Sequence, residues 1–164
     1  MNNMVAPSPV EIVIVEIALQ RFGIRAADVR EVLHAVTLSA VPGAQTVVRG
    51  IVNLRGRVVP VLDIRVLLNL PEKALEPADH LIVAQVGEQL LAICVDRAVD
   101  LVRLTPDNIA PAEGIVRNWG IVNDVAKIPD GAVLLLEPSK MLAQAELAAL
   151  GHSLRAHATI ETYS

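Results

Sequence analysis

The side chains most able to do chemistry in this 164-residue chain are its titratable and nucleophilic groups, and their spacing assembles no catalytic set. Four histidines are scattered, at positions 34, 80, 152 and 157, and the single cysteine, Cys94, lies in the apolar run Leu90–Val95. The sequence has no glycine-rich phosphate loop, no Gly-x-Ser-x-Gly motif and no pair of Cys or His ligands at metal-binding spacing. We therefore expect no catalytic centre, no metal and no cofactor, and a buried, inert Cys94 thiol.

Carboxylates are the remaining candidates for general acid–base catalysis, and they are Asp63, Asp96, Asp100 and Asp124. A general acid or base needs a positioned partner, and none is evident from the spacing of these four residues. Caps at strand ends and solvated sheet edges explain the four aspartates better.

The elements that must position these side chains centre on one stretch, Gly50–Arg65. Two runs rich in β-branched residues, Ile51–Leu54 and Val58–Ile64, flank a polar centre, which predicts two antiparallel strands around a tight turn at Gly56. Pro60 cannot donate a ladder hydrogen bond, so the second strand is expected at a sheet edge or with a bulge at Pro60.

Arg55 is the unusual residue of this predicted hairpin. Side-chain alternation puts Ile51, Asn53 and Arg55 on one face of the first strand, and Val52 and Leu54 on the other. A guanidinium keeps its charge, so Arg55 needs either solvent or a carboxylate partner.

The sequence Gly50-Ile-Val-Asn-Leu-Arg-Gly56, continued by Pro60-Val-Leu-Asp63, resembles the signature of the CheW family, the coupling adaptors of bacterial chemosensory arrays. The resemblance extends from about Val10 to Leu150. Further matching positions are Val29-Arg-Glu-Val32, Val41-Pro42-Gly43, Gly87, Val95-Asp96 and Leu104-Thr105-Pro106.

The resemblance implies a mainly β fold of two small five-stranded β-barrel lobes that share a hydrophobic core, with a C-terminal helix. A single CheW-like domain is expected over residues 10–151, between a flexible leader at 1–9 and a polar tail at 152–164. The segment Gly120-Ile-Val-Asn123 repeats Gly50-Ile-Val-Asn53, which agrees with two similar lobes.

The chain in order predicts many short strands separated by turns, and a long helix only near its end. Expected strands cover Val10–Leu19, Gln20–Ile24, Val32–Leu38, the central hairpin, His80–Val86, Leu90–Val102, Gly114–Val125 and Val133–Leu136. Short helical turns are expected at Ala26–Glu31 and Ile64–Leu70, an exposed loop at Glu72–Asp79, and a helix from Pro138 to about Leu150.

The family resemblance also implies the function, a non-enzymatic scaffold that couples chemoreceptors to a CheA-type histidine kinase. Its expected partners are the regulatory domain of the kinase and the cytoplasmic tip of methyl-accepting receptors. Glu31 and Arg55 are expected to pair beside a groove between the lobes, and Arg65 to be a solvated strand-end charge. The implied partner-binding residues are Val29, Glu31, Gly50, Asn53, Arg55, Gly56 and His80.

The composition of the chain argues against several other classes of protein. Hydrophobic residues make up 53% of the chain, so a packed core is expected, while three aromatic residues and a net charge of −4 argue against nucleic-acid binding. No apolar segment reaches the length of about 20 residues that a membrane helix needs, and the N-terminus lacks the features of a signal peptide, so a cytoplasmic protein is expected. A CheW-like adaptor for pilus motility or second-messenger control, and a small-molecule-binding β-barrel, remain open alternatives.

Overall fold

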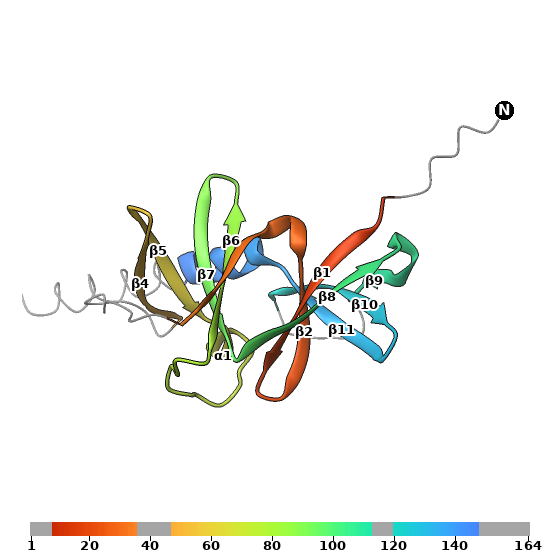
Figure 1. Ribbon diagram of the computed structural model, residues 1–164, viewed down its shortest axis with the longest axis horizontal. Coiled ribbons are helices and arrows are strands. Elements are labelled where there is room, and N and C mark those ends of the chain that lie inside the picture. Colours follow the sequence, from red (N-terminus) through yellow and green to blue (C-terminus); the bar gives the residue numbers. More distant parts are fainter. Residues whose placement is uncertain (1–7, 36–46, 113–119, 148–164) are drawn as a thin grey trace, which may run out of the picture.

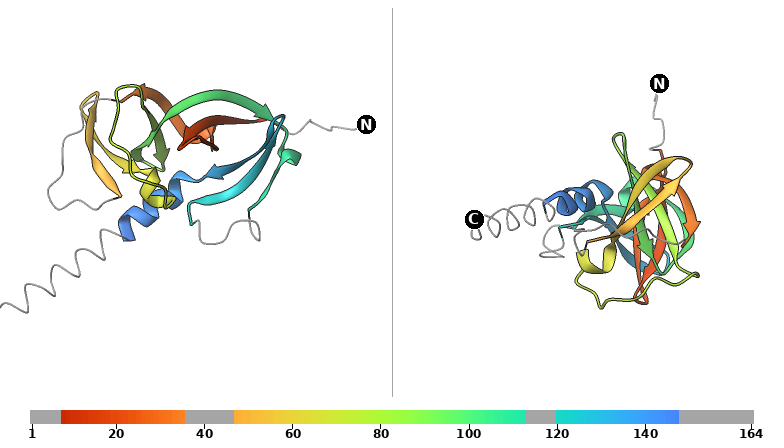
Figure 2. Two further views of the ribbon diagram at one scale, coloured as in Figure 1. Left: turned by 90° about the horizontal axis from the view of Figure 1, so that it is seen from below. Right: turned by 90° about the vertical axis from the view of Figure 1, so that its left-hand side faces the viewer.

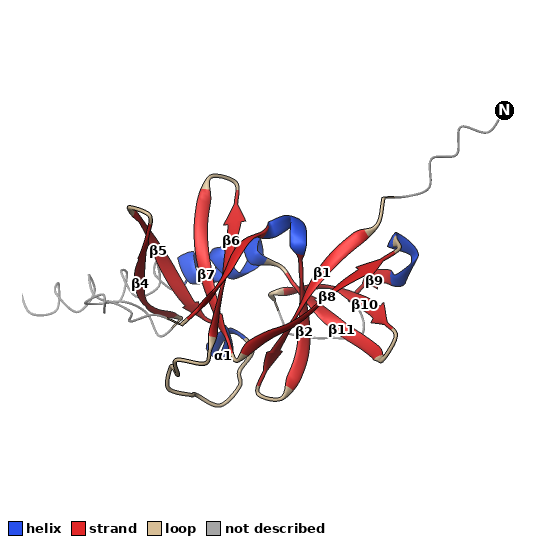
Figure 3. Ribbon diagram, viewed as in Figure 1, coloured by secondary structure: helices blue, strands red, loops and turns tan. Residues whose placement is uncertain are grey.

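The computed structural model describes residues 8–35, 47–112 and 120–147, and the fold is mainly β (Figure 1, Figure 3). The strands are β1 (Val10–Ile17), β2 (Gln20–Arg25), β3 (Val29–His34), β4 (Val48–Leu54), β5 (Arg57–Asp63), β6 (His80–Val86), β7 (Gln89–Val95), β8 (Arg97–Leu104), β9 (Ile109–Pro111), β10 (Val122–Ile128) and β11 (Gly131–Leu136). Three short helical segments join them, namely η1 (Ala26–Asp28), α1 (Ile64–Leu67) and η2 (Pro106–Asn108), and a helix occupies residues 138–147. Within the described residues, no helix is both long and apolar enough to span a bilayer.

Two sheets form two lobes that lie side by side (Figure 1). Lobe A is the six-stranded sheet β8-β1-β2-β11-β10-β9, and lobe B is the five-stranded sheet β3-β6-β7-β5-β4. The chain forms β1 and β2, builds all of lobe B, and then returns to lobe A at β8. The lobes are therefore interlocked within one domain.

The two lobes share the same arrangement and pairing of strands, apart from the three-residue strand β9 at the edge of lobe A, although the chain forms the equivalent strands in a different order. In each lobe an antiparallel hairpin, β10–β11 or β4–β5, places its second strand parallel to a neighbour, β2 or β7. Both hairpins carry a register shift in their first strand, at Val122/Asp124 and at Val48/Gly50. In these registers Gly50 corresponds to Asp124, so the repeated Gly-Ile-Val-Asn segments are offset along the two hairpins and do not occupy equivalent positions. The likeness of the two lobes is seen in the strand pairing and not in this repeat.

One hydrophobic core extends through both lobes. It joins lobe A residues such as Val15 and Phe22 to lobe B residues such as Ile82 and Ile93, and Met141 of the C-terminal helix is fully buried in it. A smaller cluster around Ile12 and Leu135 fills lobe A, and one around Val52 and Leu81 fills lobe B. The expected shared core is confirmed, and apolar side chains fill both lobes.

The C-terminal helix packs on the shared core beside α1 (Figure 2). Met141 and Ala145 are buried and Leu142 is half-buried, as the apolar spacing predicts, whereas Leu147 is exposed. The expected helix end near Leu150, most of the leader, the tail and the predicted strand residues 36–38 and 114–119 lie outside the described residues.

Several strand predictions were wrong in detail. β3 begins at Val29, because the expected helical turn Ala26–Glu31 already ends at Asp28. The run Leu90–Val102 is two strands, because the chain bends at Asp96 and passes from lobe B to lobe A. The first strand ends at Ile17, since Ala18 and Leu19 form the turn with φ of 52° and 65°. β5 is an internal strand, yet it accommodates Pro60 because its parallel pairing with β7 begins one residue later, at Val61.

Candidate functional site

Arg55 forms a bidentate ion pair with Glu31. Its Nη1 donates to Oε1 at 2.9 Å and its Nη2 donates to Oε2 at 2.8 Å. Glu31 lies on β3 and Arg55 in the β4–β5 turn, and β3 and β4 are the two outer strands of the lobe B sheet. The pair therefore links the two edges of the sheet across one end of lobe B, and the predicted salt bridge is confirmed.

The arginine of this ion pair lies largely in solvent, while the glutamate is partly covered. The Arg55 side chain is 80% exposed and the Glu31 side chain 24% exposed. The hydrogen bond from Arg55 lowers the pKa of Glu31, so both groups are charged at neutral pH. Because water screens so exposed a pair, its contribution to the free energy of unfolding is small. The main effect of the pair is to fix the positions of a guanidinium and a carboxylate on the surface, and its contribution to the stability of the fold is minor.

Asn53 and Gly56 shape the turn that presents Arg55. The Asn53 side-chain Oδ1 accepts a hydrogen bond from the Gly56 N–H at 2.9 Å. Arg55 and Gly56 both have positive φ, 50° and 82°, which is the geometry of a two-residue hairpin turn. Gly56 adopts this conformation without steric cost, and so these two predicted residues act on Arg55 through the backbone.

A groove of about 460 Å³ lies beside the ion pair. It is lined by Arg30 and Glu31 of β3, Leu54, Arg55 and Arg57 around the β4–β5 turn, Val83 of β6 and Leu90 of β7. The sequence pattern did not indicate Arg30, Arg57 or the three apolar residues, and these five residues come from five separate strands. The groove lies at the end of one lobe and not between the lobes, where the sequence analysis expected it.

Gly50 does not offer bare backbone to a partner. It is buried as the third residue of β4, where it pairs with Val61 beside the register shift. The expected first strand of the hairpin, Ile51–Leu54, was too short, because β4 begins at Val48 and includes Gly50. Val29, at the start of β3, is half-buried and packs against the shared core.

His80 lies away from the ion pair, at the opposite end of β6 from the β6–β7 turn. Its Nδ1 accepts a hydrogen bond from the Ala98 N–H of β8 at 2.8 Å, and its ring lies 5.0 Å from that of His34. This bond crosses from lobe B to lobe A. The predicted residues therefore separate into Glu31, Asn53, Arg55 and Gly56 at one end of lobe B, and His80 at the lobe junction.

A second group of charges joins the lobes, and we call Arg65, Lys73, Asp79 and Asp96 the inter-lobe network. Arg65 Nη2 donates to both oxygens of Asp96, at 2.9 and 2.8 Å, and the Arg65 side chain is only 11% exposed. Asp96 also accepts the N–H of Ala18, in the β1–β2 turn of lobe A, at 2.9 Å. The prediction of Arg65 as a solvated charge was wrong, because α1 directs it toward the bend at Asp96.

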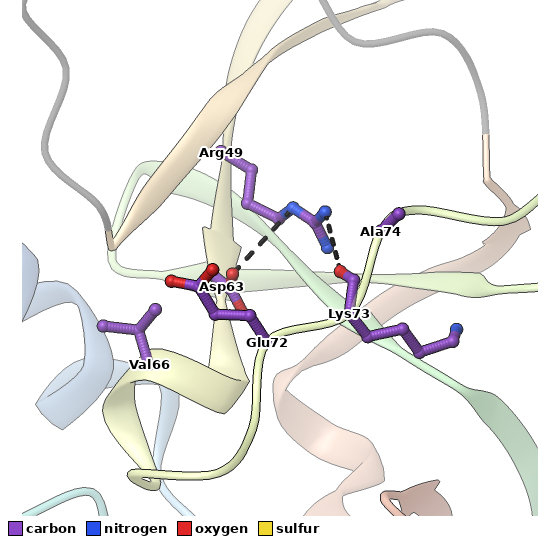
Figure 4. A pocket seen from close by; sticks show the side chains of 6 residues that line it. All are labelled: Arg49, Asp63, Val66, Glu72, Lys73 and Ala74. Carbon is purple, nitrogen blue, oxygen red and sulfur yellow. Dashed lines mark hydrogen bonds and ion pairs between the residues drawn. The ribbon is translucent and has the colours of Figure 1, made fainter.

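Lys73 extends the inter-lobe network to the loop that precedes β6. Its Nζ lies 2.6 Å from Asp79, which is 4% exposed, and 3.7 Å from Asp96. Beside it, a pocket of about 470 Å³ is lined by residues that include Arg49, Asp63 and Lys73 (Figure 4). There Arg49 donates to the backbone oxygen of Lys73 and approaches Asp63 to 3.9 Å, so its charge is balanced within the protein.

The remaining aspartates have structural partners. Asp63 caps α1 by accepting the Arg65 N–H, Asp100 accepts the Leu101 N–H, and Asp124 pairs with Arg25 at 2.7 Å. Burial raises the pKa of the Cys94 thiol to about 11, which disfavours the nucleophilic thiolate. Among the described residues, no group of three or more His, Cys, Asp or Glu side chains is arranged to hold a metal ion.

A family model and several known proteins match this chain over much of its length. Residues 11–146 match the family model of the CheW-like domain. The chemotaxis protein CheW of Klebsiella aerogenes is 23% identical over 149 residues, which cover 90% of each chain. A probable chemotaxis protein CheW of Rhizobium etli is 32% identical over 107 residues, which cover 64% of this chain and 68% of the relative.

A solved structure matches the fold. The crystal structure of the scaffolding protein TtCheW from Thermoanaerobacter tengcongensis superposes with a TM-score of 0.73 at 24% sequence identity. The match covers 79% of this chain and 89% of that protein. The two-lobed arrangement is thus found in a solved structure.

Proposed function

The chain belongs to the CheW family of chemotaxis scaffold proteins, and we propose that it couples the cytoplasmic tips of chemoreceptors to the regulatory domain of a CheA-type histidine kinase. The end of lobe B that carries Glu31 and Arg55 is the proposed contact with the kinase domain. The half-buried Val29, two residues before Glu31 on β3, belongs to the proposed receptor contact. In this function the protein acts by holding its partners in position and carries out no reaction of its own.

The observation that carries the proposal is the exposed Glu31–Arg55 pair. Both hydrogen bonds are short, at 2.9 and 2.8 Å, so the position of the Arg55 guanidinium is well defined. Because the Arg55 side chain is 80% exposed, removing the ion pair changes the stability of the protein little. Asn53 and Gly56 hold the turn that supports it. A charged surface group that is fixed in position, but contributes little to the stability of the fold, is suited to recognise a partner protein.

The test compares two exposed ion pairs, one in each lobe. The variants Arg55→Ala and Glu31→Ala remove the proposed contact, and Arg21→Ala removes a surface pair with Asp130, 3.9 Å apart, in lobe A. Binding to the organism's own kinase regulatory domain and receptor fragments is measured by calorimetry, together with thermal melting. We expect near-unchanged melting in all three variants and weaker kinase binding only for Arg55→Ala and Glu31→Ala. Equal binding by all three variants and the parent protein would refute this contact.

The proposal also places the protein in the cytoplasm, at membrane-associated receptor arrays, and includes no catalytic activity, metal or cofactor. An adaptor for pilus motility or second-messenger control would have the same fold and differ in its partners, so co-purification with the organism's receptors and kinases separates these pathways. The small-molecule alternative is disfavoured because apolar side chains fill the interior of both lobes.

A further inference from the structure

The groove beside the Glu31–Arg55 pair carries a positive charge that contrasts with the net charge of −4 of the whole chain. Three of its lining residues are arginines, Arg30, Arg55 and Arg57, and one is a glutamate. Both carboxylate oxygens of Glu31 accept hydrogen bonds from Arg55, so the charge of Glu31 is neutralised. The charges that face outward without a carboxylate partner are therefore those of Arg30 and Arg57.

Both arginines are exposed and available. Among the described residues, neither Arg30 nor Arg57 has a carboxylate within 4.0 Å, and Arg57 makes one long hydrogen bond, 3.3 Å, to the backbone oxygen of Glu88. They enter the groove from opposite sides, Arg30 from β3 and Arg57 from the start of β5. Each of these guanidinium groups can donate two parallel hydrogen bonds to a carboxylate of a partner.

The groove lining also has an apolar part, which we call its floor. Leu54, Val83 and Leu90 line it, and the side chains of Leu54 and Leu90 are only partly buried. A phosphate-rich polymer could pair with the two arginines but gains nothing from these apolar side chains. A protein segment with acidic and aliphatic side chains gains from both the floor and the two arginines.

We propose that this groove binds an acidic segment, flanked by aliphatic side chains, on the kinase regulatory domain. Arg30 and Arg57 meet the carboxylates and select this partner, while Leu54 and Leu90 contact the aliphatic side chains. The inference rests on the proposed function, in which the end of lobe B meets the kinase, and it adds the chemistry of the matching kinase surface.

The experiment is a charge reversal, Arg30→Glu with Arg57→Glu, with Arg103→Glu as the matched control. Arg103 is an exposed arginine on β8, in the other lobe. The affinity of each full-length protein for the organism's own kinase regulatory domain is measured at several salt concentrations. We expect the double reversal to weaken binding about tenfold or more at low salt and to reverse the salt dependence, so that added salt no longer weakens binding, because attraction becomes repulsion. Arg103→Glu is expected to bind within twofold of the parent protein.

The outcomes separate the two proposals. If the parent protein binds the kinase domain and the double reversal binds equally well with the same salt dependence, the acidic-segment inference is wrong and the proposed function stands. If the parent protein does not bind the kinase domain, the proposed function fails and the inference fails with it. A neutral pair, Arg30→Gln with Arg57→Gln, is expected to lie between the parent and the reversal, and unaltered melting temperatures exclude unfolding as the cause.

Discussion

Two ion pairs with the same closest distance, 2.8 Å, should differ widely in what they contribute to stability. Arg65–Asp96 lies at the lobe junction, with side chains 11% and 25% exposed, whereas the Arg55 side chain of the other pair is 80% exposed. Solvent screens the second pair but screens the first much less. We therefore predict that Asp96→Ala destabilises the protein strongly and that Glu31→Ala destabilises it only slightly.

The magnitude for Asp96→Ala follows from the contacts that are lost. A hydrogen bond from a charged donor contributes about 1.5–3 kcal/mol and a backbone N–H about 1 kcal/mol. Asp96 accepts both kinds, from Arg65 and from Ala18, and its removal leaves the guanidinium of Arg65 without its main partner. Because Asp96 retains some exposure, we take the lower part of the combined range, about 2.5–3 kcal/mol of unfolding free energy.

Urea denaturation at pH 7 measures this difference. The midpoint of Asp96→Ala should fall well below that of the parent protein with an unchanged slope, and Arg65→Ala should behave similarly. The double variant should be less destabilised than the sum of the two single variants, because the residues share one interaction. If Glu31→Ala proves as destabilising as Asp96→Ala, the reasoning from exposure is wrong.

The same pair predicts a dependence on pH. Burial alone would raise the pKa of Asp96, but the hydrogen bonds from Arg65 and Ala18, and the charges of Arg65 and Lys73, lower it overall. A group whose pKa is lower in the folded state stabilises the fold fully above its unfolded pKa of about 3.9, and this stabilisation is lost as pH falls through the folded pKa. The stability advantage of the parent protein over Asp96→Asn should therefore shrink below about pH 4. An advantage that stays constant from pH 6 to pH 3 would contradict the assignment.

Three further substitutions or reactions are predicted. Gly23→Ala should cost about 1–3 kcal/mol in urea denaturation, since a Cβ there would lie 2.6 Å from Ile12 and 2.7 Å from Leu135; an unchanged midpoint would contradict this. Gly50→Asp should cost at least about 2 kcal/mol, because it places a carboxylate at a buried position of β4; normal melting would show that the site admits solvent. Cys94 should react with a thiol reagent at pH 8 only after unfolding, since it is buried and its pKa is about 11; rapid labelling of the folded protein would refute this.

Local sequence patterns were sufficient for most strands and turns. The β4–β5 hairpin, the turn at Gly87 and the turn at Pro129–Gly131 all combine β-branched runs with a glycine that takes positive φ. The turn at Ala18 and Leu19 carries no such signal, because both residues fit a strand equally well. Its left-handed conformation is held by a distant group, the Asp96 carboxylate, which no local pattern reveals.

The candidate site was only partly predictable for a related reason. Glu31 and Arg55 were chosen together from the family resemblance, and the structure confirms their contact. Arg30 and Arg57 look like ordinary solvated strand charges in the sequence, and only the closing of the lobe B sheet brings them to one groove. Arg65 was misjudged because its partner lies 31 residues away, at a bend inside an apolar run.

The shared core explains how such a small protein can act by positioning. Val15 and Phe22 of lobe A are buried in the same cluster as Ile82 and Ile93 of lobe B. Any rotation of one lobe against the other would expose part of this cluster, at a cost of about 25 cal/mol for each Å² of apolar surface. The inter-lobe network adds charge-assisted bonds, from Arg65 to Asp96, that such a rotation would break. Groups at the end of lobe B are therefore held in a fixed relation to lobe A, and this fixed relation is what an adaptor needs in order to set the spacing of two partners.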